Sequence, residues 1–226
     1  MNRNAHMVKR FRDRSEAGRL LGLELVKYAV QKDVLVLALP RGGVPVGFEV
    51  AQALKAPLDV FVVRKLGVPG HEEVAMGAIS TGGVRVLNEE VIRSIPVSDT
   101  VIEIVAAREL IELRRRELAY RSHATAPEVS GKTIILVDDG IATGSTMCVA
   151  IAALHKHRPA RIVVAAPTAP PSFRKALGAD VDEVVVITKP KPFHAVGQVY
   201  EVFGQTSDEE VHELLTRSKQ CLQVSR

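Results

Sequence analysis

The sequence predicts an α/β protein whose parallel sheet is covered by helices on both faces, in three layers. Short apolar runs alternate with segments of helical spacing along the chain. Parallel strands read as continuous apolar runs because both of their faces are buried. A hydrophobic content of 46% in 226 residues is enough for one large core, so we expect a single domain over residues 1–226.

The first part of the chain predicts two helices and two strands. Residues 14–30 place leucines near helical spacing and predict an amphipathic helix. The run 33–39 ends at "PRGG" and predicts a buried strand that enters a loop. Residues 44–56 return to helical spacing, and the apolar run 57–67 predicts a second strand.

The remainder continues the alternation. Glycines predict an irregular connection over 68–83, and "VRVLNEE" predicts a strand behind it. The longest helix is predicted over 97–121, with Ser98 or Asp99 as its N-cap. After Gly131 we expect strands at 133–138, 161–166 and 183–188, and helices at 145–157, 171–177 and 208–218.

Composition narrows the function classes. The net charge is +4, but the basic residues are scattered, aromatic residues make up 4% and Trp is absent, which favours small anionic ligands over nucleic acid. Cys148 and Cys221 form no metal or disulfide framework and are typical of a reducing compartment. No apolar run approaches the ~18 residues of a membrane span, and the basic start lacks a secretory pattern. We expect a cytoplasmic protein without a membrane partner, in which the residues before Met7 are an addition to the native chain.

Three loops are candidates for a binding site. In open parallel sheets, ligands bind outside the carboxyl ends of the strands. The loops "PRGG", "RKLGVPGHEE" and "DDGIATGST" follow three predicted strands and would share one rim. The third loop leads into a helix near Ser145, whose unpaired N–H groups favour a phosphate. Gly140 and Gly144 allow close backbone approach, while Thr143, Ser145 and Thr146 add hydroxyl donors.

The same loop begins with two carboxylates, Asp138 and Asp139. A carboxylate accepts hydrogen bonds strongly from a vicinal diol, so the loop predicts a ribose 5-phosphate group. The alternative is structural: the two acids cap a helix and the glycines form a turn. A Walker A loop and a Rossmann fingerprint are absent, and Ala142 stands where a nucleophile elbow would have its serine.

The stretch "IILVDDGIATGST" resembles the phosphoribosyl pyrophosphate (PRPP) binding motif of type I phosphoribosyltransferases. "RKLGVPGHEEVAMGAISTGG" and "PFHAVGQVYEVFGQTSDEEV" resemble a bacterial subgroup of that family whose acceptor is not well defined. The resemblance implies the type I fold, with a core over about 30–188. A small hood would come from the N-terminal helix and about 189–226.

The resemblance also implies roles for individual residues. Asp138 and Asp139 would hold the ribose hydroxyls and count as catalytic. The 5-phosphate and ribose would contact the loop residues Gly140, Ile141, Ala142, Thr143, Gly144, Ser145 and Thr146.

Pyrophosphate would be held by the first two loops. Arg41, Gly42 and Gly43 match the family's pyrophosphate loop, and Arg64 and Lys65 could neutralise the leaving group and so count as catalytic. For the last two, the alternative is a solvated basic pair. Mg²⁺ would arrive with PRPP near the two acids and need no dedicated metal cluster.

The implied reaction is displacement of pyrophosphate from PRPP by a nitrogen nucleophile, which depends on positioning and charge stabilisation. Residues 67–80 are the candidate lid. His71 lies within it, but a histidine on a surface segment of this kind more often has no acid or base role. The hypoxanthine–guanine branch has an Asp where this chain has Ala142, which argues against a 6-oxopurine handled in that way. Lys189, Phe193 and Tyr200 could contact the acceptor, or could simply anchor the C-terminal segment.

Three function classes remain open. An active transferase of nucleotide metabolism is favoured because Arg41, Arg64 and Lys65 serve pyrophosphate. A regulator that binds PRPP or a nucleotide without turnover would keep the acids and the phosphate loop. A phosphatase or hydrolase lacks a recognisable nucleophile or metal-ligand cluster. A homodimer is possible for a member of this family, and the basic helix with "ELRRREL" is its candidate surface.

Overall fold

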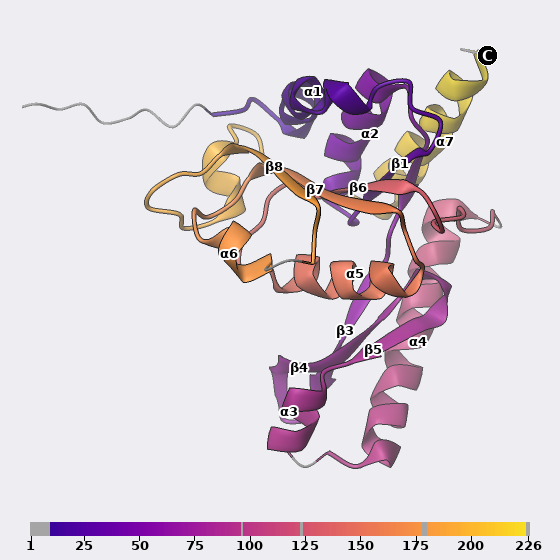
Figure 1. The fold of residues 1–226 in the computed structure, drawn as a ribbon, viewed down its shortest axis with the longest axis vertical. Coiled ribbons are helices and arrows are strands. Elements are labelled where there is room, and N and C mark those ends of the chain that lie inside the picture. Colours follow the sequence, from indigo (N-terminus) through magenta and orange to yellow (C-terminus); the bar gives the residue numbers. More distant parts are fainter. Residues whose placement is uncertain (1–9, 96, 123, 178–179, 225–226) are drawn as a thin grey trace, which may run out of the picture.

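The computed structural model describes residues 10–95, 97–122, 124–177 and 180–224, so the expectation for the residues before Met7 lies outside it. Two units are visible in Figure 1. One is a parallel sheet with helices on both faces, and the other is a smaller antiparallel sheet that extends away from it with a long helix alongside.

The parallel sheet has five strands in the order β2-β1-β6-β7-β8. Ala38 at the end of β1 pairs with Val137 at the end of β6, so the two strands finish level with each other. The predicted parallel sheet is therefore confirmed, and the loops that follow β1 and β6 start side by side. The strands are β1 Val34–Ala38, β2 Leu58–Val60, β6 Thr133–Val137, β7 Arg161–Thr168 and β8 Glu183–Thr188.

Helices bury both faces of this sheet. Every residue of β1 and β6 is buried, which explains why these strands read as unbroken apolar runs. One core forms under α1 Arg14–Glu24, α2 Gly43–Leu54 and α7 Asp208–Val224. The other forms under α5 Ser145–Lys156 and α6 Phe173–Leu177.

The second unit is an antiparallel meander of β3 Val63–Val68, β4 His71–Ser80 and β5 Val84–Leu87. It leads into α3 Glu89–Ser94 and α4 Asp99–Arg121. Helix α4 contacts β3 and β4, while α5 contacts all three strands of the meander. Helix α5 therefore lies between the two sheets, as Figure 1 shows.

Two expectations for this part were wrong. The single strand expected over 57–67 is two strands in different sheets, because the chain leaves the parallel sheet after β2 and pairs elsewhere from β3 on. The irregular connection expected over 68–83 contains strand β4, so most of the candidate lid 67–80 is paired in a sheet.

Most other elements agree with their predictions, but the N-terminal helix ends at Glu24, and the strand predicted for "VRVLNEE" ends at Leu87, before α3. The Ser98 side chain accepts a hydrogen bond from the Val101 amide, which confirms it as the N-cap of α4. Helix α7 extends to Val224, beyond the expected end at 218. Within the described residues, no helix combines the length and apolar character needed to cross a membrane. Short 3₁₀ turns complete the fold: η1 Val26–Tyr28, η2 Thr81–Gly83 and η3 Val196–Val199.

Candidate functional site

The two acids lie directly at the end of β6. The Asp139 amide donates a hydrogen bond of 2.8 Å to Asp138 Oδ1, which turns the Asp138 carboxylate back over its own loop. Burial and the neighbouring charge of Asp139 raise the pKa of Asp138 well above its ordinary value. A partner that donates hydrogen bonds to Asp138 would therefore be bound strongly, because it would relieve the cost of a buried charge.

The loop after the acids forms a hollow of about 150 Å³. Gly144 takes a left-handed conformation, with φ of 81°, and a Cβ there would lie 2.8 Å from the Phe173 ring. The loop thus requires glycine at this position, immediately before the first turn of α5. The hollow is lined by Asp138, Gly140, Ile141, Ala142, Thr143, Gly144, Thr146 and Met147.

The loop after β1 packs directly against the acids. A Cβ on Gly42 would lie 2.1 Å from Asp139 Oδ2, and one on Gly43 would lie 2.8 Å from the Val137 carbonyl oxygen. Only glycine allows this approach, which brings the first turn of α2 to the rim beside Asp138 and Asp139. The loop also contains a cis peptide bond, between Pro40 and Arg41.

Strand β3 brings Arg64 and Lys65 to different neighbours. Consecutive side chains of a strand point to opposite faces. Lys65 Nζ lies 2.8 Å from Ser145 Oγ at the start of α5. Arg64 points to α4, where its Nε and Nη2 donate to Glu109 Oε2 at 2.8 and 2.6 Å. Of the two, Lys65 is the residue that contacts the start of α5, next to the loop that follows β6.

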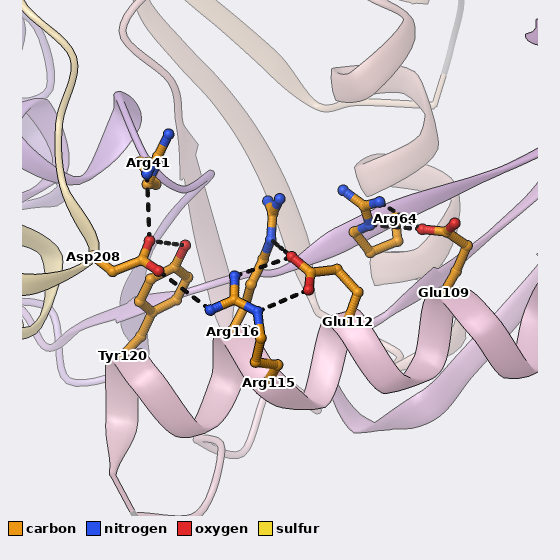
Figure 2. A network of polar contacts seen from close by, with 8 residues as sticks. All are labelled: Arg41, Arg64, Glu109, Glu112, Arg115, Arg116, Tyr120 and Asp208. Atoms are coloured by element: carbon orange, nitrogen blue, oxygen red, sulfur yellow. Dashed lines mark hydrogen bonds and ion pairs between the residues drawn. The ribbon is translucent and has the colours of Figure 1, made fainter.

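A network of arginines and carboxylates runs along α4 (Figure 2). Arg41 Nη1 lies 3.6 Å from Asp208 Oδ1, which also accepts a hydrogen bond of 3.1 Å from Tyr120. Arg115 donates to both Asp208 and Glu112. The network therefore joins the loop after β1 to α4 and to the start of α7.

Asp139 is held by a residue that the sequence did not single out. Arg14, in α1, donates from Nε to Asp139 Oδ2 at 2.8 Å, and both side chains are mostly buried. Its guanidinium also donates to the Gly204 carbonyl oxygen and lies 4.0 Å from the centre of the Phe203 ring. Asp138 thus faces the hollow, while Asp139 is engaged by Arg14 on its other side.

The structure separates the three expected acceptor residues. Tyr200 is 4% exposed, its hydroxyl donates to the Asp139 carbonyl oxygen at 2.6 Å, and its ring lies between Phe11 and Phe203. The ring that we expected to contact an acceptor is covered, and it anchors the C-terminal segment to the acid loop instead. Lys189 is exposed and Phe193 partly exposed.

Several residues of the site were missed from the sequence. For Arg14 and Tyr120 the reason is that their partners are distant in the chain. Arg14 and Asp139 are 125 positions apart, and Tyr120 and Asp208 are 88 apart. The only local signal was the density of arginines in "ELRRREL", which was assigned to a surface. The missed residues are Arg14, Glu109, Glu112, Arg115, Arg116, Tyr120, Phe203 and Asp208.

The donor set at the rim fits a magnesium ion that arrives with a phosphorylated ligand. Mg²⁺ binds through one or two carboxylates, with phosphate oxygens and waters completing its shell. Asp138 offers a carboxylate at the edge of the hollow. Among the described residues, no group of three or more His, Cys, Asp or Glu side chains could hold a metal by itself.

These features define an α/β protein with two acids and a glycine- and hydroxyl-rich loop at the rim of its parallel sheet. Comparison with known families is more specific. The model of the phosphoribosyl transferase domain matches residues 17–201. The chain belongs to this family, as a member with the type I fold.

The most informative relatives agree with this assignment. Two proteins of Mycobacterium tuberculosis, from strains CDC 1551 and H37Rv, are each 46% identical over 211 residues and are assigned to the phosphoribosyl transferases by name only. The alignment covers 93% of this chain and 47% of theirs, so the chain spans about half the length of the curated relatives it matches. The crystal structure of TT1426 from Thermus thermophilus is 41% identical with a TM-score of 0.83, and the match covers 92% of this chain and 98% of that one.

Proposed function

We propose that the protein transfers the 5-phosphoribosyl group of magnesium-bound PRPP to a nitrogenous acceptor, a nucleobase by preference, and releases pyrophosphate. One observation supports this most strongly. The loop after β1, the loop after β6 and strand β3 meet at the acid pair and the start of α5, through Gly42 on Asp139 and Lys65 on Ser145. A ligand with a phosphate at one end, a diol in the middle and a diphosphate at the other end would satisfy all three segments.

In this proposal the chain works by positioning and charge. The N–H groups and hydroxyls of residues 140–146 hold the 5-phosphate, and Asp138 accepts hydrogen bonds from the ribose hydroxyls. Gly42 and Gly43, with Arg41 and Lys65, face the pyrophosphate. Bound Mg²⁺ would supply charge neutralisation on the pyrophosphate oxygens.

The bond changes balance without a protein nucleophile. The bond between the anomeric carbon and the pyrophosphate oxygen breaks, and its electron pair leaves with that oxygen. The lone pair of the acceptor nitrogen forms the new bond, and an acceptor that carries a proton on this nitrogen loses it to solvent or to a base. Holding the acceptor in line with the leaving group supplies most of the acceleration.

The test is magnesium-dependent release of pyrophosphate from PRPP across purine bases, pyrimidine bases and orotate. We expect release with one acceptor in the wild type and none in Asp138→Asn. If wild-type protein shows no binding of PRPP by calorimetry, the proposal is wrong.

The paired strand β4 favours a second candidate, a regulator that binds PRPP or a nucleotide without turnover. Residues 67–80 were expected to form a lid, but most of them belong to strand β4, which pairs with β3 and β5. Without closure, water would reach the activated sugar and compete with the acceptor. Tight PRPP binding by the wild type, combined with no pyrophosphate release across a broad acceptor panel, would select the regulator.

We also propose that two copies of the chain associate through the outward face of α4. Ile104, Ile111 and Leu118 recur every seven residues there and are 64%, 72% and 55% exposed. This spacing is typical of helices that pair along a seam. Light scattering should give the mass of a dimer for the wild type and of a monomer for Ile111→Arg; a monomeric wild type would refute the association.

A further inference from the structure

Three arginines from different elements lie along one side of α4. Arg41 comes from the loop after β1, Arg64 from β3 and Arg116 from α4 itself. Figure 2 shows Arg116 between the other two, with its guanidinium directed to the same side as theirs. Arg41 directly precedes Gly42, which touches Asp139, and Arg64 directly precedes Lys65, which touches Ser145. The row therefore begins beside the proposed PRPP site at Arg41, while Arg64 at its other end points to α4, on the face of β3 opposite to Lys65.

Each of these arginines is held from behind by a carboxylate. Glu112 Oε1 accepts from Arg116 Nε at 2.8 Å, Glu109 accepts from Arg64, and Asp208 lies opposite Arg41. In the described structure the contacts of Arg116 engage Nε alone, and its terminal amino groups point away from α4. A guanidinium fixed through Nε presents a preorganised fork to phosphate oxygens.

Two further observations support the geometry. Hydrogen bonds from Arg115 and then Arg116 lower the pKa of Glu112 to about 2, so this carboxylate stays ionised and keeps its hold on Arg116 in any ordinary buffer. Burial and then Asp208 raise the pKa of Tyr120 to about 12, while Arg116 and Arg41 both oppose this rise. Both arginines are thus close enough to the same phenol to influence it.

The charges of the side chains drawn in Figure 2 favour an anionic ligand. Arg41, Arg64, Arg115 and Arg116 outnumber the carboxylates Glu109, Glu112 and Asp208 drawn with them. Arg115 is fully occupied, because it donates to Glu112 from two nitrogens and to Asp208 from a third. Of the neighbouring residues Arg115 and Arg116, Arg116 is therefore the one whose terminal amino groups can bind a ligand.

We infer that Arg116 is a further pyrophosphate-binding residue, which helix α4 adds to Arg41. This inference rests on the proposed function and specifies one of its subsites. Arg116 would contact the diphosphate of PRPP before transfer and the released pyrophosphate afterwards. Glu112 is its positioning residue, since it holds Arg116 and does not face the ligand.

The test distinguishes binding of the diphosphate end of PRPP from binding of its ribose 5-phosphate end. Titration calorimetry at fixed Mg²⁺ would measure PRPP, pyrophosphate and ribose 5-phosphate binding to wild type, Arg116→Ala and Arg114→Ala. Arg114 is exposed on the same helix two positions earlier and so points roughly to the opposite face, which makes it a matched control. For Arg116→Ala we expect PRPP and pyrophosphate to bind about 10- to 30-fold more weakly, as for loss of one charge-assisted hydrogen-bonded contact.

Ribose 5-phosphate lacks the diphosphate, so its affinity should change less than about twofold in Arg116→Ala, and Arg114→Ala should bind all three ligands as the wild type does. Arg116→Lys, which keeps the charge without the fork, should recover part of the loss and provides a second variant if Arg116→Ala does not fold. Unchanged pyrophosphate affinity in a folded Arg116 variant, or equal weakening of all three ligands, would overturn the inference while leaving the transferase proposal intact. Failure of the wild type to bind PRPP would overturn both.

Discussion

The two sheets of this protein differ in how clearly the sequence predicts them and in which residues they bring to the candidate site. Strands β1, β2 and β6 of the parallel sheet are buried along their whole length, and the rim of this sheet carries the two acids and two glycine loops. Strands β3 and β5 of the antiparallel sheet are largely half-buried, and this unit brings cations to the rim through Arg64, Lys65 and α4. In the proposed function, the parallel sheet supplies shape and hydroxyl recognition, while the added sheet supplies charge for an anion.

The joint between the two units should be the most sensitive position for stability. Arg121, at the end of α4, donates to Asp59 Oδ1 at 2.7 Å and to the Val60 carbonyl oxygen, and its side chain is 4% exposed. Burial raises the pKa of Asp59 even with Arg121 beside it. Arg121→Met leaves this carboxylate buried and unpaired, so we expect a loss of about 3–5 kcal/mol in the free energy of unfolding, measured in urea.

A double variant sharpens this prediction. Asp59→Asn combined with Arg121→Met removes the unpaired charge and should be more stable than Arg121→Met alone. Equal stabilities of the single and double variants would show that the charge pair does not hold the units together.

Substitution of Asp138, the acid that lines the hollow, should have the second largest effect. We expect it to weaken ligand binding and to change stability little. Asp138→Asn keeps the shape of the side chain but removes the carboxylate that lines the hollow. We expect PRPP to bind about 100-fold more weakly, equivalent to about 2.7 kcal/mol. Calorimetry with PRPP and Mg²⁺ measures this, with Asp180→Asn, an exposed acid, as the control. Wild-type affinity in Asp138→Asn would mean that the ribose lies elsewhere.

The parallel sheet and its rim could be predicted because their signals are local. A run of apolar residues, two acids and a glycine-hydroxyl loop occupy one stretch, from Thr133 to Thr146, and the phosphate hollow forms within it. The added sheet gave no such signal. Strand β4 begins with four exposed residues and contains Gly77, which reads as a turn, although glycine inside a strand also marks close backbone approach.

The cationic side of the site could not be predicted for a different reason. Arg116 and Arg64 come from α4 and β3, and only the tertiary fold places them in one row with Arg41. A single sequence carries no information on such pairs. Arg14 is a similar case, since its contact with Asp139 depends on how α1 packs beside the C-terminal segment.

The pairing of β4 with β5 can be tested at Gly77. A Cβ there would lie 2.5 Å from the Val86 carbonyl oxygen in the neighbouring strand. Gly77→Ala should therefore push the strands apart and cost about 1–3 kcal/mol of unfolding free energy. Gly204→Ala, where an added Cβ meets no atom within 4 Å, should leave stability nearly unchanged. If the two variants proved equally stable, β4 would not be paired with β5 as described.

The smallest effect should come from the cap that starts α4. Ser98 Oγ accepts a hydrogen bond of 3.4 Å from the Val101 amide, a long bond at an exposed helix end. Ser98→Ala should therefore cost about 1 kcal/mol of unfolding free energy, within the range found for N-caps. Thr100→Ala, an exposed change two residues into the helix sequence, is the control and should cost less. Because Arg116 lies at the other end of α4, pyrophosphate affinity should be the same in both variants. A marked loss of that affinity in Ser98→Ala would mean that the whole helix, and not Arg116 itself, sets the charge of the site.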